Sequence, residues 1–189
     1  PPGLAIVAFG PKAIEARKAM ERINGYYMDI LRWLPTMQDP GKYYATHPVN
    51  MIYALEKGLE LVMKEGLANR YKRHHALGKA VRAGLAEYGM KALAPEDIAA
   101  PTLSCILYPE GVNDAEFRAK LASKKMIVAG ALANLAGKAF RIGHMGNVTE
   151  EMFVKAMELV GETLKEMGFE ADSEKAVSTF KAVYRESLS

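Results

Sequence analysis

One short segment near the end of the sequence carries the side chain best suited to binding chemistry. It reads Phe-Arg-Ile-Gly-His-Met-Gly over residues 140–146, and Arg141 interrupts an otherwise apolar strand. A guanidinium removed from water needs an anionic partner, and its planar fork matches a carboxylate through two parallel hydrogen bonds. Gly143 and Gly146 would let a ligand or another backbone come close. The segment therefore predicts a carboxylate site, or else an arginine that pairs with a protein carboxylate or emerges at a strand end.

The stretch before it, residues 130–137, consists mainly of small side chains. It begins at Gly130 and ends at Gly137, and it predicts either a flexible flap beside the arginine or a plain turn.

A second unusual segment is Lys-Tyr-Tyr-Ala-Thr-His-Pro over residues 42–48. Its hydroxyl groups lie in a loop, because the residue before a proline resists helix. A predicted helix follows directly, and hydroxyls near a helix N-terminus suit a phosphate. The alternative is a capped loop with packed tyrosines.

Other chemical signatures are missing from the sequence. There is no CxxC, HExxH or GxSxG motif and no P-loop. His74 and His75 are adjacent, so their rings diverge on a helix, and we expect no metal site. The single cysteine, Cys105, lies in an apolar run that predicts a buried strand, and we expect it to pack in the core rather than to act as a nucleophile.

Composition narrows the class of protein. The chain has 189 residues, half of them hydrophobic and a quarter charged, with a formal net charge of +3. These values exclude a disordered chain, a collagen and a disulfide scaffold. No apolar run approaches the roughly 20 residues of a membrane span. The most basic stretch, residues 70–75, indicates a solvated helix face more than a nucleic-acid surface, so we expect neither a membrane nor a nucleic-acid partner.

The elements that must position these residues change character along the chain. The first is a short apolar run that predicts a strand buried in a mostly parallel sheet, and such a strand needs partners. The second half alternates strands and helices in the order β, β, α, β, β, α, which is typical of helices on one side of a small, largely antiparallel sheet. The predicted elements are a strand over 4–9, a helix over 11–22, an amphipathic aromatic segment over 26–34 broken between Pro35 and Pro40, helices over 49–65 and 67–88, strands over 91–93 and 102–108, a helix from the Asn113 cap to 123, strands over 126–128 and 139–142, a helix from Asn147 or Thr149 to 167, and a last helix from 173.

Taken in order, four segments resemble one enzyme family. They are Pro-Pro-Gly at residues 1–3 ahead of a strand, Tyr-Tyr-Met-Asp at 26–29, Tyr-Tyr-Ala-Thr-His-Pro at 43–48 and Phe-Arg-Ile-Gly-His-Met-Gly at 140–146. The set is similar to the C-terminal half of class V pyridoxal-phosphate aminotransferases, in the alanine–glyoxylate and serine–pyruvate branch. The resemblance runs to about Gly168. It implies an α/β fold of the aspartate-aminotransferase type (fold type I), with residues 1–48 ending the large cofactor-binding domain and residues 49–189 forming a connecting helix and a small α+β domain.

The resemblance also implies roles for particular residues. Arg141 matches the arginine that grips the substrate α-carboxylate, and Gly130 falls in the loop near the substrate. Tyr43 and Thr46 match residues that reach the cofactor phosphate of the neighbouring subunit, which implies a homodimer with shared active sites. The lysine that forms the Schiff base, and the aspartate that pairs with the pyridine nitrogen, would lie upstream of Pro1, so no catalytic residue is assigned within this chain.

The sequence therefore predicts part of a cytoplasmic aminotransferase. Its substrates would be a small amino acid, alanine or serine, and a small 2-oxo acid, glyoxylate or pyruvate, and its partner would be its own N-terminal half. Without the lysine we expect the chain alone to be inactive. The alternatives are another class V enzyme, a desulfurase or lyase, and a non-catalytic α+β interaction module. His144 has no assigned role.

Overall fold

The computed structural model describes residues 3–189, and the chain divides into two compact units. Unit 1 is Pro1–Lys64 and unit 2 is Glu65–Ser189. Pro1 and Pro2 of the first resemblance segment lie outside the described residues. The predicted domain boundary after residue 48 stays a prediction.

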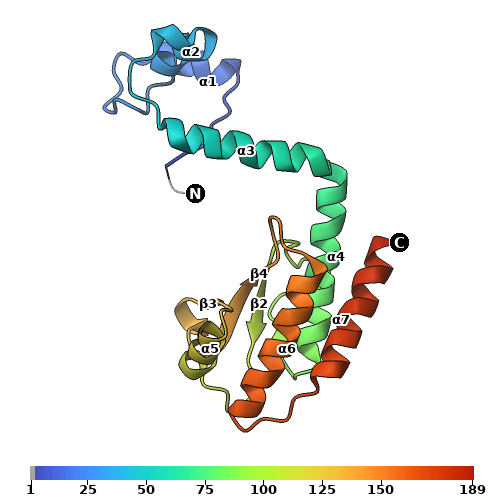
Figure 1. The fold of residues 1–189 in the computed structure, drawn as a ribbon. Helices are drawn as coiled ribbons and strands as arrows, with labels where there is room; N and C mark the ends of the chain where they lie inside the picture. The colour runs from blue at the N-terminus through green and yellow to red at the C-terminus, as the bar shows by residue number, and fades with distance from the viewer. Residues whose placement is uncertain (1–2) are drawn as a thin grey trace. The chain divides into compact units, whose positions relative to one another are not determined.

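Unit 1 begins with short helices joined by long loops and ends in a longer helix (Figure 1). An ion pair ties the first two helices together, because Arg17 donates two hydrogen bonds of 2.7 and 2.8 Å to the Asp29 carboxylate. Asp29 also caps the second helix by accepting from the backbone N–H of Leu31. The elements are α1 (Pro11–Lys18), α2 (Ile30–Gln38), the 3₁₀ turn η1 (Pro40–Lys42) and α3 (Val49–Glu65).

Two sequence predictions for unit 1 are wrong. Residues 4–9 form no strand, and the Ile6 side chain is 86% exposed. A single strand cannot satisfy its own backbone groups, and no other described segment pairs with this one. Pro35 does not end the aromatic segment but lies inside α2, which begins only at Ile30. The Asp29 cap sets that start.

Unit 2 follows the predicted order of elements closely. Asn113 caps α5 as expected, since its side chain accepts from the N–H of Glu116, and Thr149 caps α6. The strand predicted over 126–128 is wrong, because the pairing begins at Ala129 instead. The elements are α4 (Leu67–Ala86), β1 (Lys91–Ala92), β2 (Leu103–Leu107), α5 (Asp114–Ser123), β3 (Ala129–Gly130), the 3₁₀ turn η2 (Ala133–Leu135), β4 (Ala139–Gly143), α6 (Glu150–Glu166) and α7 (Ser173–Leu188).

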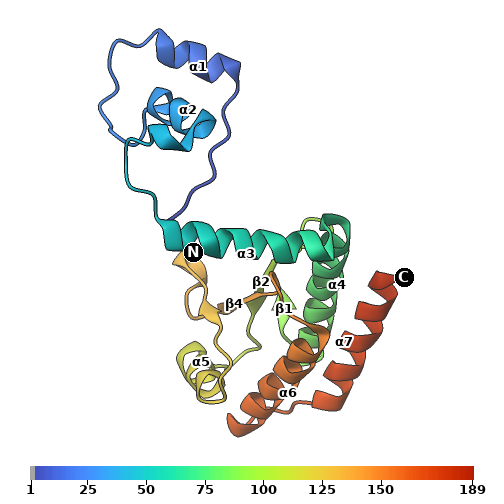
Figure 2. The ribbon, with the colours of Figure 1, turned by 45° about the horizontal axis from the view of Figure 1, so that its top comes forward.

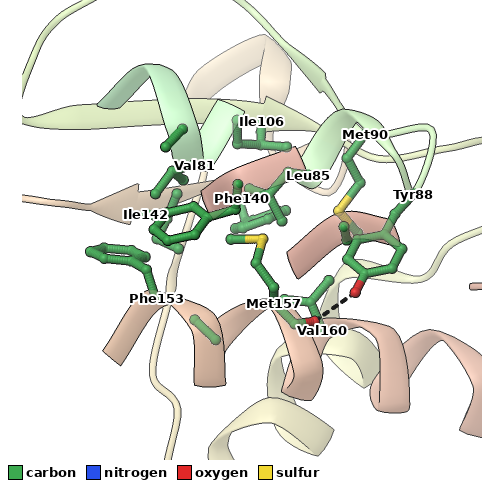
Figure 3. Packing of buried hydrophobic residues seen from close by; sticks show 14 of the residues in the cluster. Val81, Leu85, Tyr88, Met90, Ile106, Phe140, Ile142, Phe153, Met157 and Val160 are labelled. Atoms are coloured by element: carbon green, nitrogen blue, oxygen red, sulfur yellow. Dashed lines mark hydrogen bonds between the residues drawn. The ribbon is translucent and has the colours of Figure 1, made fainter. Parts of the chain in front are cut away.

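The sheet of unit 2 is antiparallel, with strand order β1-β2-β4-β3. Helices α4, α6 and α7 lie together beside it (Figures 1 and 2). Side chains alternate across a strand, so Ile106, Phe140 and Ile142 enter the core (Figure 3). There the Tyr88 hydroxyl donates to the backbone oxygen of Met157 at 2.7 Å. The opposite sheet face has less cover, and it carries Arg141.

The chain as described from residue 3 onward contains no helix long and apolar enough to cross a membrane.

Candidate substrate and cofactor site

Arg141 lies on β4, between β2 and β3 in the sheet. Its Cα partners are Cys105 on β2 and Ala129 on β3. Its neighbours Phe140 and Ile142 turn into the core, so Arg141 projects from the other face, where it is half-buried. The strand thus fixes the backbone of this arginine from both sides while leaving its side chain within reach of a ligand.

The Arg141 guanidinium uses one of its donors within the protein. Its Nε–H donates to the backbone oxygen of Gly130 at 2.9 Å. Neither of its terminal nitrogens forms a hydrogen bond or an ion pair with any residue from 3 to 189. The alternative of an arginine paired with a protein carboxylate is therefore excluded for the described chain, and the outer edge of the guanidinium can serve an anionic ligand.

Gly130 lies between two arginines. Its carbonyl accepts from Arg141, and a Cβ placed on it would lie 3.4 Å from the guanidinium of Arg118. Arg118 is held in turn by Asp114, to which it donates bonds of 2.9 and 2.7 Å. The Tyr108 hydroxyl donates to the same carboxylate at 2.8 Å. The structure thus brings together the two predicted substrate residues, Arg141 and Gly130.

The pKa values of Asp114 and Tyr108 agree with their hydrogen bonds around Arg118. The Arg118 guanidinium holds the pKa of the Asp114 carboxyl below its ordinary value, and the Tyr108 hydroxyl acts in the same direction. Burial, with the hydrogen bond to Asp114, raises the pKa of Tyr108. Asp114 is therefore charged and Tyr108 neutral near pH 7. Sequence reasoning missed Arg118, although its i,i+4 spacing from Asp114 on a predicted helix was a usable signal.

Cys105 does not lie in the core as predicted. It is only half-buried, on the less covered sheet face, directly across from Arg141. Its apolar run looks buried on both faces, but burial alternates along β2 because helices cover only one side of the sheet. Cys105 is nevertheless fixed in a central strand rather than in a mobile loop.

Tyr43 and Thr46 lie in unit 1, in the loop between η1 and α3. Both side chains are exposed, Tyr43 by 59%. Neither hydroxyl forms a hydrogen bond to the part of the chain that the structure describes. Two free hydroxyls three residues apart, just before the first turn of α3, form a donor set that suits a phosphate group.

The neighbouring tyrosine anchors this loop. The Tyr44 ring packs edge-on against Trp33, with centroids 5.0 Å apart. Tyr26 also contacts the Tyr44 ring, and its hydroxyl donates to the Tyr44 backbone oxygen at 2.9 Å. Adjacent side chains of an extended segment point to opposite sides. Packing of Tyr44 therefore accounts for the exposure of Tyr43.

His144 occupies a buried position that the sequence left unassigned. Its imidazole is fully buried, 2.9 Å from Ser104 Oγ and 2.9 Å from the backbone oxygen of Pro101. A histidine between two glycines directly after the arginine strand was a visible signal, but its partners lie about 40 residues away in sequence. The rings of the neighbouring residues His74 and His75 diverge on α4 as predicted, with His74 buried and His75 exposed.

The sequence and the fold of this chain are similar to those of known aminotransferases. No family model matches the chain. An uncharacterized aminotransferase of Methanocaldococcus jannaschii is 41% identical over 184 residues, which are 97% of this chain and 48% of that protein. L-Aspartate–glyoxylate aminotransferase of Paracoccus denitrificans is 34% identical over 190 residues, 98% of this chain and 47% of that protein.

Solved structures agree with these relatives. The ureidoglycine–glyoxylate aminotransferase of Bacillus subtilis superposes with a TM-score of 0.83 and 27% identity, over 92% of this chain and 45% of that one. An alanine–glyoxylate aminotransferase from Nostoc gives a TM-score of 0.67 at 25% identity. The fold is therefore the α/β fold of these aminotransferases, as predicted.

The predicted resemblance is confirmed, since the chain is a relative of the glyoxylate aminotransferases. The chain spans about half the length of the curated relatives it matches.

Proposed function

We propose that this chain is the C-terminal part of a pyridoxal-phosphate aminotransferase that exchanges an amino group between a small amino acid and a small 2-oxo acid. The observation that carries the proposal is Arg141, whose two terminal nitrogens have no partner in residues 3–189 and whose Nε is bonded to Gly130. The relatives named for glyoxylate support alanine, serine or aspartate as donor and glyoxylate as acceptor.

Arg141 would bind the α-carboxylate shared by amino acid and 2-oxo acid. The Nε bond to Gly130 holds the guanidinium plane, so its outer edge can offer two parallel N–H groups to a carboxylate. Because both substrates carry this group, the same contact serves both directions of the exchange. Fixing one end of the substrate lowers the entropy cost of aligning its α-carbon for reaction.

Pyridoxal phosphate would supply the electron sink that lets the α-carbon lose a proton. The residues present fit its phosphate, because the exposed hydroxyls of Tyr43 and Thr46 are free to donate. The lysine that carries the cofactor would come from sequence outside this chain. Support for that lies in the relatives, which are about twice as long.

A homodimer with shared active sites belongs to the same proposal. Helix α3 supports it, because none of its 17 residues is buried and several large apolar side chains are exposed. An amphipathic helix of this composition ordinarily buries its apolar face against another surface. The N-terminal half or a second copy would provide that surface. The cytoplasmic location expected from the sequence stays a prediction.

The test is substitution of Arg141 in the complete protein that its gene encodes. Arg141→Ala should raise the KM for every amino acid and 2-oxo acid by about 100-fold, since two charge-assisted hydrogen bonds are lost. Arg141→Lys keeps the positive charge but loses the two-pronged geometry, so its KM values should lie between those of the unsubstituted protein and Arg141→Ala. Cofactor absorbance should stay unchanged. The control is Arg185→Ala, an exposed arginine on α7. Unchanged KM values in Arg141→Ala would overturn the proposal.

A second measurement addresses the phosphate contacts. Tyr43→Phe and Thr46→Val should each raise the Kd for pyridoxal phosphate about fivefold, because each removes one hydroxyl donor. Tyr53→Phe, an exposed tyrosine of α3, is the control. Unaltered cofactor affinity would remove both residues from the site. Release of sulfide from cysteine, lost in Cys105→Ser, would instead favour a desulfurase.

A further inference from the structure

A chain of buried polar groups lies beneath the end of β4. Arg82 on α4, Ser104 on β2 and His144 after β4 are 8%, 4% and 0% exposed. The Arg82 Nη1 group donates to Ser104 Oγ at 3.2 Å, and Ser104 Oγ lies 2.9 Å from His144 Nε2. The group joins three elements that are far apart in sequence.

The hydrogen-bond partners fix the proton positions in this network of buried polar groups. The backbone oxygen of Pro101 can only accept, so His144 Nδ1 must carry a hydrogen and donate to it. A neutral imidazole then accepts at Nε2, which makes the Ser104 hydroxyl the donor. The hydroxyl oxygen remains free to accept from Arg82. Both imidazole nitrogens and the Ser104 hydroxyl are thus satisfied, and burial lowers the pKa of His144 to about 4, which keeps the ring neutral.

The network of buried polar groups ends, on the Arg82 side, at a carboxylate. Arg82 donates two bonds, of 2.7 and 2.6 Å, to Glu96. The same guanidinium donates to the backbone oxygen of Ala100 at 3.4 Å. The segment that leads into β2 is thereby held by the same network that ends at β4.

Backbone pairing holds the end of β4 on one side only, because β3 pairs with this strand no further than Arg141. On the β2 side the Leu103–Gly143 pair closes the ladder, and one more bond runs from His144 N–H to the Thr102 oxygen. Gly143 has no side chain to pack, and Gly146 adopts a positive φ of 82°. The imidazole of His144 is the buried side chain between these glycines. It supplies the anchor for the strand that carries Arg141 three residues earlier.

Helix α4 is shaped to admit this imidazole. A Cβ on Gly78 would lie 2.9 Å from His144 Cε1 and 3.1 Å from Arg82 Nη1. Alanine at this helical position suits the backbone, so it would add a methyl group to the network without removing any polar atom. The ring or the guanidinium would have to shift.

We infer that His144, held by Ser104 and Arg82, is a positioning residue that sets the place of the Arg141 guanidinium for the substrate carboxylate. This inference rests on the proposed aminotransferase function. It assigns His144 no contact with substrate. Its effect passes through the backbone of β4 to Arg141 and, through the Nε bond, to Gly130.

The experiment compares Gly78→Ala with Gly58→Ala in the complete protein. Both place alanine in a helix, but a Cβ on Gly58 meets no atom within 4 Å in the described chain. The probe is propanoate, a carboxylate without an amino group, and its Kd is measured by calorimetry. Gly78→Ala should weaken propanoate binding about tenfold, because a small displacement of a binding group costs affinity steeply. Gly58→Ala should leave the Kd unchanged.

Variants of His144 sharpen the test. His144→Ala should weaken propanoate binding at least as much as Gly78→Ala, while His144→Gln, which keeps an acceptor for Ser104, should recover part of the loss. A variant of His144 that fails to fold leaves Gly78→Ala and Ser104→Ala to decide. Propanoate affinity unchanged in Gly78→Ala would overturn the inference.

A second readout needs no ligand. The resonance of the Arg141 Nε–H, assigned by its loss in Arg141→Lys, reports the bond to Gly130. It should shift in Gly78→Ala and Ser104→Ala but not in Gly58→Ala. If the unsubstituted protein neither transaminates nor binds propanoate, the proposed function fails. The resonance alone then supports the positioning role if it shifts and rejects it if it does not.

Discussion

The two units of this chain differ in what they bury. All the buried apolar residues of the described chain lie in unit 2, on helices α4–α7, the sheet strands and their connections. In unit 1 the single buried residue among those described is Thr36. Apolar burial is the main favourable term in folding. The unit that carries Arg141 therefore builds its own core, whereas the unit that carries Tyr43 and Thr46 depends on local contacts such as the Arg17–Asp29 pair.

The difference in burial agrees with the different roles that the proposed function gives to the two units. A carboxylate-binding arginine needs a backbone held to fractions of an ångström, and unit 2 supplies this with a central strand and a packed core. Loop hydroxyls that serve a phosphate need to be accessible, and unit 1 leaves them exposed. Its exposed apolar side chains are the surface that a partner or an N-terminal half would cover.

The largest expected effect tests where stability resides. Phe180 on α7 is fully buried and stacks on Tyr184, with centroids 6.0 Å apart. Phe180→Ala should lower the free energy of unfolding by about 3–5 kcal/mol through lost burial and a cavity. Ile6→Ala, at a side chain 86% exposed, should change it by less than about 0.5 kcal/mol. Urea unfolding followed by far-ultraviolet circular dichroism measures both. Similar losses would contradict the comparison.

The next effect is the pH dependence of unit 2. Burial, opposed by the bond to Pro101 and aided by Arg82 and His74, lowers the pKa of His144 to about 4 from 6.5. The unfolded chain therefore binds more protons between pH 4 and 6.5, so stability falls as the pH drops through this window. A shift of this size corresponds to roughly 3 kcal/mol.

Urea unfolding at pH 4.5 and 7 measures this dependence. His144→Gln should lose stability at pH 7 yet show a flatter pH profile, and the carboxylates that titrate in both proteins cancel in the difference. An equal pH dependence in both proteins would show that His144 is not held neutral.

The smallest effect concerns unit 1. Trp33 is the single tryptophan of the sequence, and its indole N–H donates to the Tyr27 backbone oxygen at 2.7 Å, so its fluorescence reports this unit alone. Asp29→Asn should shift the fluorescence transition to lower urea, because it weakens both the bond to Arg17 and the α2 cap. The circular dichroism transition of unit 2 should stay in place. Asp39→Asn, at the η1 cap, is the control. Coincident shifts of both signals would show that the units unfold together.

The pH dependence of that pair has a definite sign. The hydrogen bonds from Arg17 hold the pKa of Asp29 below its ordinary value. Their contribution is therefore present above the ordinary pKa of 3.8 and is lost as the pH falls through the lower folded value. In Asp29→Asn the fluorescence transition should lose this acid dependence.

Much of the chain from residue 49 onward could be predicted because its signals are local. Helical spacing gave α3 its bounds, and the Asn113 and Thr149 caps gave α5 and α6 their starts. The wrong predictions concern residues whose structure depends on a segment distant in the sequence. Residues 4–9 have the composition of a strand, but a strand exists only with a neighbour. Cys105 has core-like neighbours in sequence, but only the cover on each sheet face sets its burial.

The sequence by itself determined the family, the order of elements in unit 2 and the presence of an arginine in an apolar strand, because these follow from residue types and short spacings. The tertiary structure decided what that arginine meets. Pairing of β4 between β2 and β3 places Cys105 across from Arg141, the Gly130 carbonyl on its Nε, and Ser104 against His144. These contacts join residues 11 to 40 positions apart. Strand pairing, together with the packing of helices on one sheet face, selects them, since no local preference of the chain does.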